Sequence, residues 1–74
     1  MAVLPVVSGR EVVRAFEKDG WIMVRQRGSH MILVKDGRIA SLSVPDHREV
    51  ARGTLRSLIR SSGLTVDQFV KLVG

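Results

Sequence analysis

Residues 21–45, WIMVRQRGSHMILVKDGRIASLSVP, decide the fold of this chain because they predict three consecutive β-strands. Three segments within them are rich in β-branched and other apolar residues, as strands are: 21–26, 30–34 and 39–44. A tight connection at 27–29 joins the first two segments, and Asp-Gly, a strong hairpin signal, lies within 35–38. Short connections join antiparallel strands, so the sequence predicts a three-stranded antiparallel sheet.

The third predicted strand indicates what covers the sheet. Ala40, Leu42 and Val44 alternate with Ser41 and Ser43, so one face of the strand is apolar and the other is polar. Such alternation is typical of a sheet that packs on helices with one face and meets solvent with the other. The proline that follows ends the strand.

The first two predicted strands carry polar residues beside apolar ones. With strict alternation, Met23, Arg25 and Arg27 share one face of the first strand. Both faces of the second strand are mostly apolar. Its first residue, His30, is predicted to lie near the rim of the sheet, where an imidazole stays accessible.

A helix is predicted before the strands. Ser8 and Glu11 have the spacing of a capping box, in which each side chain accepts a free backbone N–H of the first turn. Apolar residues then recur with the helical period, and Gly20 is placed to end the helix. We therefore predict a helix over 9–19.

Two more helices are predicted after the strands. A polar connector, 46–53, leads to a second helix over 54–62, and a short third helix begins at the capping box of Thr65 and Gln68. The order helix, three strands, helix, helix predicts one two-layer α+β domain over 1–74, with the helices on one face of the sheet.

The amino-acid composition limits which chemistry the protein can carry out and in which compartment it is expected. The chain has 74 residues and no cysteine, which excludes disulfides, thiolate metal sites and cysteine catalysis, and which fits a reducing cytoplasm. No apolar stretch approaches the roughly 20 residues that span a bilayer. Residues 1–7 are apolar but too short for a signal peptide and lack its basic start.

The chain is basic. Lys and Arg total 12 against 7 Asp and Glu, and the net charge of +5 favours a polyanionic partner such as nucleic acid.

Few side chains suit acid–base or metal chemistry. Histidine occurs twice, at His30 and His47, tyrosine is absent, and the acidic residues are scattered. No spacing of these residues matches a dedicated metal site, and no glycine-rich loop matches those of nucleotide-binding enzymes. We therefore expect no metal and no cofactor.

The stretch RQRGSH, from Arg25 to His30, holds the highest concentration of chemically functional side chains in the chain. The guanidinium groups of Arg25 and Arg27 match phosphate oxygens, and Gly28 allows a backbone to approach closely. The hydroxyl of Ser29 and an imidazole follow, and histidine takes or gives a proton near neutral pH. Together these groups suit cleavage of an RNA phosphodiester.

The same residues also have ordinary structural interpretations. His30 would be a polar residue at a strand start, the two arginines would be solvated, and the glycine would serve the turn alone. His47 would be a loop or cap residue. Trp21 is interpreted as a core anchor beneath the first helix rather than as a base-stacking platform. Three arginines with a four-residue period form a basic stripe, which could contact RNA phosphate, a protein partner or only solvent: Arg52, Arg56 and Arg60.

Several motifs, in this order and spacing, resemble the HicA toxins, which are small mRNA interferases of bacterial toxin–antitoxin systems. The motifs cover nearly the whole chain: SGREV at 8–12, GW at 20–21, RQRGSH at 25–30, VPDH at 44–47, GTLRSLIRSSGL at 53–64 and TVDQF at 65–69.

This resemblance implies a fold and an activity. It implies a fold like the double-stranded-RNA-binding domain (dsRBD), ribosome-independent cleavage of mRNA, and the histidine of Gly28-Ser29-His30 as the catalytic residue. It also implies a HicB-type antitoxin that binds the toxin and blocks this histidine. Members often have a basic residue between the proline and histidine of the later motif. Here that residue is Asp46, which lowers the local positive charge.

Three functions are compatible with the sequence. The first is a metal-independent endoribonuclease, the toxin of a stress-response system, with His30 as general acid or base. His47, Ser29 or water would supply the second proton transfer. RNA contacts are expected from the turn and from one lysine beyond it: Arg25, Arg27, Gly28, Ser29 and Lys35. The second function is a small RNA-binding domain without catalysis. The third is a protein-interaction subunit whose basic surface docks an acidic partner.

Overall fold

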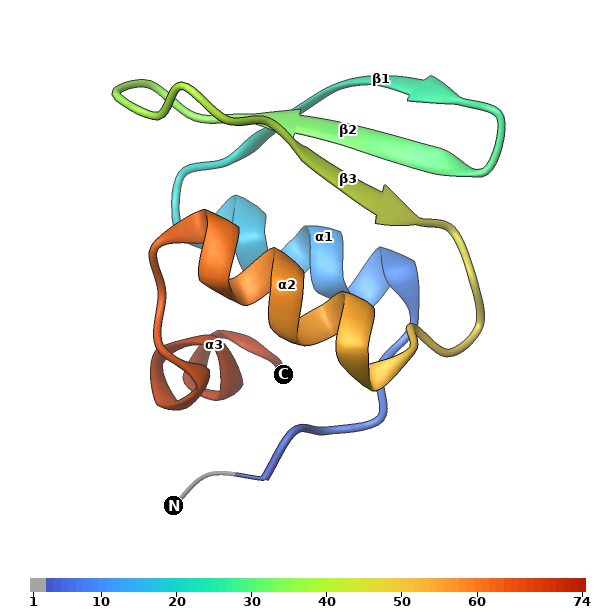
Figure 1. Cartoon of the computed structure of the whole chain (residues 1–74), viewed down its shortest axis with the longest axis vertical. Helices are drawn as coiled ribbons and strands as arrows, with labels where there is room; N and C mark the ends of the chain where they lie inside the picture. The colour runs from blue at the N-terminus through green and yellow to red at the C-terminus, as the bar shows by residue number, and fades with distance from the viewer. Residues whose placement is uncertain (1–2) are drawn as a thin grey trace.

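The computed structural model describes residues 3–74, so residues 1 and 2 of the predicted domain lie outside the described part. Six elements follow one another along the chain: α1 (Gly9–Lys18), β1 (Ile22–Arg27), β2 (His30–Val34), β3 (Leu42–Pro45), α2 (Arg52–Ser62) and α3 (Val66–Leu72). The strands form one antiparallel sheet in the order β1-β2-β3 (Figure 1). The predicted α+β class and element order are confirmed.

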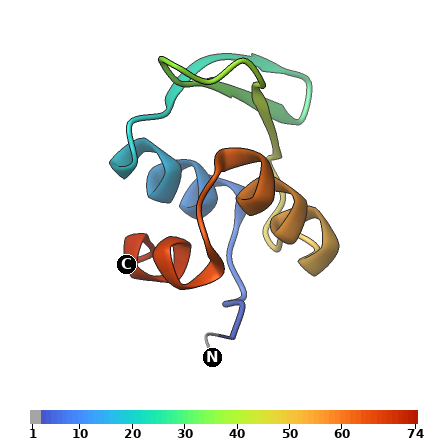
Figure 2. The ribbon, with the colours of Figure 1, turned by 60° about the vertical axis from the view of Figure 1, so that its left-hand side comes forward.

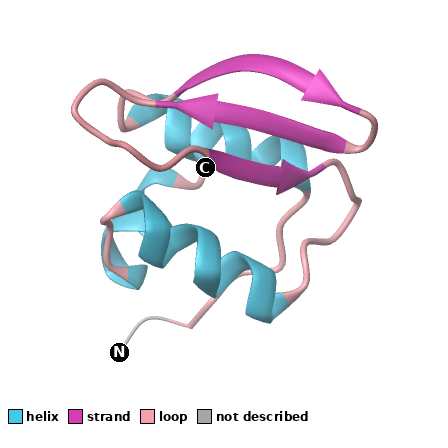
Figure 3. Cartoon of the chain, turned by 45° about the horizontal axis from the view of Figure 1, so that its top comes forward, coloured by secondary structure: helices cyan, strands magenta, loops and turns pink. Residues whose placement is uncertain are grey.

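The helices lie on one side of the sheet, in two layers. Figure 2 shows α1 and α2 side by side beneath the strands, with α3 on the far side of them. α3 packs on α1 and α2. Figure 3 shows that the opposite face of the sheet carries no helix. Within residues 3–74, no helix is long and apolar enough to cross a membrane.

The core extends from the sheet through the layer of α1 and α2 to α3. Phe16 of α1 packs against both Trp21 and Phe69, with ring centroids 6.3 and 5.3 Å apart. Leu33 of β2 and Leu42 of β3 are buried in the same core cluster. Trp21 is 2% exposed, which confirms it as a core anchor. Its indole N–H has no hydrogen-bond partner in the described part of the chain.

Both predicted capping boxes are present. The Ser8 hydroxyl accepts from the Glu11 N–H, and the Glu11 carboxylate accepts from the Ser8 N–H. Thr65 and Gln68 make the equivalent pair at the start of α3. Gly20 ends the first helical segment with a φ of 97°, a left-handed conformation that glycine adopts without steric cost.

The third strand is shorter than predicted. It begins at Leu42 rather than at residue 39, and Ile39 and Ala40 are exposed in a loop. The Asp-Gly pair forms a turn within that loop and does not make a tight hairpin. Arg38 explains where the loop goes, because its guanidinium donates to the carbonyl oxygen of Ser61 at 2.8 Å and so holds the loop at the end of α2.

A β-bulge changes the faces of the first strand. The register shifts between Met23 and Arg25, so Met23 pairs with Leu33 on the helix side and Arg25 pairs with Ile32 on the open side. Strict alternation had placed Met23 and Arg25 on one face, which is wrong. The extra residue of a bulge reverses the facing of the side chains that follow it.

The connector before α2 also differs from the prediction. The helix begins at Arg52, two residues earlier than predicted, and Val50, an apolar residue within the polar connector, is buried. The Val50 N–H donates to the carbonyl oxygen of Val7 at 2.8 Å. This bond ties the connector to the segment that precedes α1.

Candidate functional site

The β1–β2 hairpin positions the RQRGSH residues. Its loop is the residue pair Gly28 and Ser29. Gly28 has a φ of 56° and Ser29 has a negative φ, which is typical of a type II′ turn and favours glycine at the first position. A side chain at Gly28 would meet no atom within 4 Å, so the need for glycine lies in the backbone conformation.

His30 is the first residue of the central strand. It pairs with Arg27 on one side and with Pro45 on the other, and its side chain is exposed. Directly paired residues of antiparallel strands share a face, with Cβ atoms about 5 Å apart. The imidazole of His30 and the guanidinium of Arg27 therefore begin side by side on the open face. Arg25 lies on the same face, where it pairs with Ile32.

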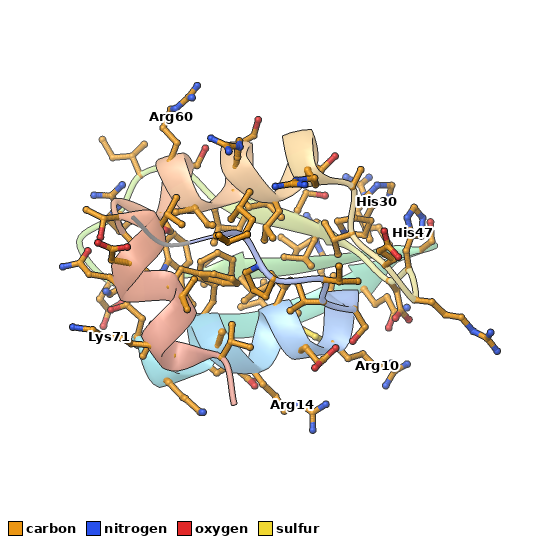
Figure 4. The ribbon with its side chains drawn as sticks, turned by 90° about the horizontal axis from the view of Figure 1, so that it is seen from below. Arg10, Arg14, His30, His47, Arg60 and Lys71 are labelled. Carbon is orange, nitrogen blue, oxygen red and sulfur yellow. The ribbon has the colours of Figure 1, made fainter. Side chains whose placement is uncertain are left out.

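The structure brings the second histidine to the same end of the molecule. Figure 4 shows His30 and His47 at the same end of the molecule, His47 coming from the segment that leaves β3. Two backbone hydrogen bonds hold that segment: the Asp46 N–H donates to the Ser29 carbonyl at 2.6 Å, and the Gly9 N–H donates to the His47 carbonyl at 2.9 Å. The predicted secondary candidate thus lies at the same end of the sheet as the primary one.

Side-chain contacts further fix Asp46. Its carboxylate oxygen Oδ2 lies 3.3 Å from a guanidinium nitrogen of Arg10 and accepts from the Gln26 amide at 3.5 Å. The start of α1 also lies close to the end of β3: a side chain at Gly9 would collide with the carbonyl oxygen of Pro45. The sequence did not predict Arg10 as part of this end, nor the contact of Gln26 with Asp46, since these residues are 36 and 20 positions from Asp46 and no local pattern connects them.

Lys35 lies apart from the other predicted RNA-binding residues. It follows the last residue of β2, about 16 Å along the strand from His30 at the usual rise per residue. Its ammonium group pairs with the Asp19 carboxylate at 3.1 Å. The structure therefore brings Arg25, Arg27, Gly28, Ser29 and His30 together, and leaves Lys35 at the other end of the sheet.

Both histidine side chains are available to a ligand. Among residues 3–74, neither imidazole takes part in a hydrogen bond or an ion pair, and both residues are exposed. The same part of the chain holds no group of three or more His, Cys, Asp and Glu that could bind a metal ion. This arrangement can hold a phosphate between guanidinium and imidazole groups and can move protons at it.

Comparison with known proteins decides the family. The model of a family described as the HicA toxin of bacterial toxin–antitoxin systems matches residues 9–64, more than half of the chain. The chain belongs to the HicA toxin family. No curated protein matches it significantly. Among solved structures, this HicA-family chain is similar to a chain of a "Toxin-Antitoxin complex from Streptococcus pneumoniae", with 29% identity, a TM-score of 0.70, and coverage of 78% of this chain and 98% of that one.

One position departs from the pattern that the HicA resemblance implies. Where members often carry a basic residue between proline and histidine, this HicA-family chain has Asp46. The carboxylate pairs with Arg10, so the negative charge at this position is balanced from α1. The segment keeps a fixed position next to the β1–β2 loop even though the local cation is absent.

Proposed function

We propose that this HicA-family chain is a metal-independent endoribonuclease, the mRNA interferase toxin of a toxin–antitoxin pair. The observation that carries the proposal is the shared end of the sheet, where an exposed His30 lies beside Arg27 and where His47 also lies. Two imidazoles and a guanidinium on an accessible rim suit the phosphodiester of an extended RNA strand, since all three side chains are exposed. Family membership supports the same substrate.

The proposed reaction needs two proton transfers. The 2′-oxygen of the substrate ribose forms a bond to the adjacent phosphorus, and the bond from phosphorus to the 5′-oxygen breaks. The products are a cyclic phosphate and a 5′-hydroxyl. One group removes the 2′-hydroxyl proton and another gives a proton to the leaving oxygen. His30 takes one of these roles, and His47 is the leading candidate for the other, ahead of Ser29 and water.

The arginines stabilise charge on the phosphorus oxygens. Arg27 pairs with His30 across the ladder, so its guanidinium reaches the same phosphate, and Arg25 extends the cationic surface along the open face. Gly28 and Ser29 present the hairpin loop to the RNA backbone. Lys35 is not assigned to this phosphate, because its ion pair with Asp19 holds it at the other end of the sheet.

An antitoxin protein is the second proposed partner. The solved relative is part of a toxin–antitoxin complex, which supports a protein partner for this chain. The open face of the sheet offers apolar side chains that a protein would cover, among them Ile22 and Val34, at 61% and 38% exposure. A HicB-like antitoxin bound there would block His30. Action on mRNA places both partners in the cytoplasm.

Cleavage by the purified protein tests the proposal. Wild-type protein in EDTA should cleave RNA to products with cyclic phosphate ends, and His30→Ala should reduce the rate by about 100-fold or more, as for loss of a general acid or base. Lys35→Gln is the matched control, since it also removes a cationic site candidate but one that lies away from the hairpin. Equal cleavage by His30→Ala and wild type would contradict the assignment, and loss of activity in EDTA would contradict metal independence.

A non-catalytic RNA-binding domain is the alternative function. The same guanidinium groups and the net charge of +5 favour it. It predicts salt-sensitive RNA binding that His30→Ala leaves intact, with no cleavage on long incubation.

A further inference from the structure

The arginine stripe of α2, defined as Arg52, Arg56 and Arg60, makes no polar side-chain contact within residues 3–74. All three side chains are exposed, and α2 contains no acidic residue. Within residues 3–74, none of the three guanidinium groups takes part in an ion pair or a side-chain hydrogen bond. Four of the nine other Lys and Arg residues do have partners there: Arg10, Lys18, Lys35 and Arg38.

The stripe is therefore unfavourable for the isolated chain. Like charges four residues apart on a helix repel each other and weaken it slightly. No acidic neighbour on the helix offsets this repulsion. A ligand with regularly spaced negative charges would turn the repulsion into attraction.

The rest of the exposed face of α2 indicates the class of that ligand. Apart from the arginines, its exposed residues are glycine, serine and threonine: Gly53, Thr54, Ser57 and Ser61. The centre of a protein–protein interface is rich in aromatic and other apolar side chains, whereas nucleic-acid interfaces are more polar and much more positive. The face of α2 has the second composition, while the exposed apolar residues lie mainly on the sheet and its loop, among them Ile22, Val24 and Ile39.

The direction of α2 connects the stripe to the candidate site. Figure 1 shows that the β1–β2 loop, the end of β3 and the start of α2 all lie at one end of the molecule. The stripe begins there at Arg52 and runs away from the histidines to Arg60, over about 12 Å of helix. Figure 4 shows Arg60 pointing outward, on the side of α2 away from α1. Arg56 and Arg60 also border a shallow hollow of about 250 Å³ with Ile59 and Leu64 in its lining.

We propose that the arginine stripe binds the phosphates of the RNA strand that extends beyond the cleavage site. Successive guanidinium groups, about 6 Å apart along the helix, would each contact one phosphate, and the hollow beside Arg56 and Arg60 would take a sugar or base. The inference rests on RNA being the substrate. It adds that the substrate is a strand long enough to reach from the hairpin to the far end of α2.

Binding measurements on an inactive background test the proposal. The protein carries His30→Ala, and the probe is a fluorescent 20-nucleotide single-stranded RNA titrated at several salt concentrations. The stripe variant is Arg52→Gln/Arg56→Gln/Arg60→Gln. The matched control, Arg14→Gln/Lys18→Gln/Lys71→Gln, removes the same number of charges from α1 and α3. Thermal unfolding of both variants verifies folding.

The stripe variant should lose about tenfold or more in affinity at low salt, and its slope of log K against log salt should fall by about 2, since each phosphate contact on a single strand contributes about 0.7. The control should keep most of the slope. Equal slopes in both variants would overturn the proposal. The stripe would instead belong to the interface with the antitoxin under two conditions. The slope of the stripe variant would be unchanged, and a co-expressed antitoxin would no longer neutralise that variant.

A second measurement separates this inference from the proposed cleavage. On a dinucleotide, which is too short to reach α2, active protein with and without the stripe should have the same kcat/KM. On the 20-nucleotide RNA the stripe variant should have a higher KM. If the wild type cleaves neither substrate, the endoribonuclease proposal fails, while the binding comparison still reports on the stripe.

Discussion

The backbone N–H of Asp46 donates a hydrogen bond of 2.6 Å to the carbonyl oxygen of Ser29. This bond joins the residue before His30 to the residue before His47, so one contact couples the two segments that carry the histidines. The Asp46 side chain adds a second connection through its ion pair with Arg10 of α1. The geometry of the site therefore depends on the packing of α1 against the end of β3.

Gly9→Ala should disturb this packing. The added methyl group would collide with the carbonyl oxygen of Pro45, which is backbone and yields only if the strand end moves. We expect a loss of stability of about 1–3 kcal/mol, as for other overpacked positions, together with slower RNA cleavage. Gly53→Ala is the control because a side chain there meets no atom within 4 Å. It should leave stability unchanged or raise it by up to about 1 kcal/mol. Similar urea midpoints for the two variants would contradict the close contact.

His47→Ala should slow cleavage by about 100-fold or more if this residue transfers a proton. The dependence of kcat/KM on pH distinguishes that role from a structural one. Wild type should give a bell-shaped profile with two limbs, and the variant should lose one of them. A uniform decrease with both limbs retained would mean that His47 only holds the loop.

Arg27→Gln should lower kcat/KM for RNA far more than Lys35→Gln does. Arg27 lies beside His30 in the ladder, whereas Lys35 pairs with Asp19 away from the hairpin. Loss of a charge-assisted contact to the transition state costs about 2–3 kcal/mol, or roughly 30- to 150-fold. Lys35→Gln breaks a partly exposed ion pair and should cost less than about 1 kcal/mol of stability. Comparable kinetic losses in both variants would place the phosphate elsewhere on the sheet.

The start of α1 should weaken in acid. The Ser8 backbone N–H, and next the Ser8 hydroxyl, hold the pKa of the Glu11 carboxyl below its ordinary value of 4.5. Because the folded-state pKa is the lower one, the stabilisation is complete above the unfolded value and is lost as pH falls through the lowered pKa. Glu11→Gln should remove this part of the pH dependence between neutral pH and acid. Unfolding curves at several pH values, for wild type and variant, would show two parallel profiles if the interaction were absent.

Local sequence determined most of the secondary structure. The capping boxes at Ser8 and Thr65 fixed two helix starts, because their hydrogen bonds lie within one turn. Gly28 and Gly20 marked backbone conformations that other residues rarely adopt. The residues RQRGSH also pointed to phosphate chemistry, since the hairpin keeps neighbours in sequence close in space. The motifs and their order also indicated the HicA family, to which the chain belongs.

Tertiary structure decided what local patterns do not encode. The bulge between Met23 and Arg25 placed Arg25 on the open face, and it depends on pairing with β2 rather than on the residues of β1 alone. Arg38 holds its loop at the end of α2 through a hydrogen bond to Ser61, and β3 begins only after that loop, at Leu42. His47 lies at the same end of the sheet as His30, where hydrogen bonds from Asp46 to Ser29 and from Gly9 to His47 cross between distant segments. Such contacts form when the core brings helices and strands together, and no local period records them.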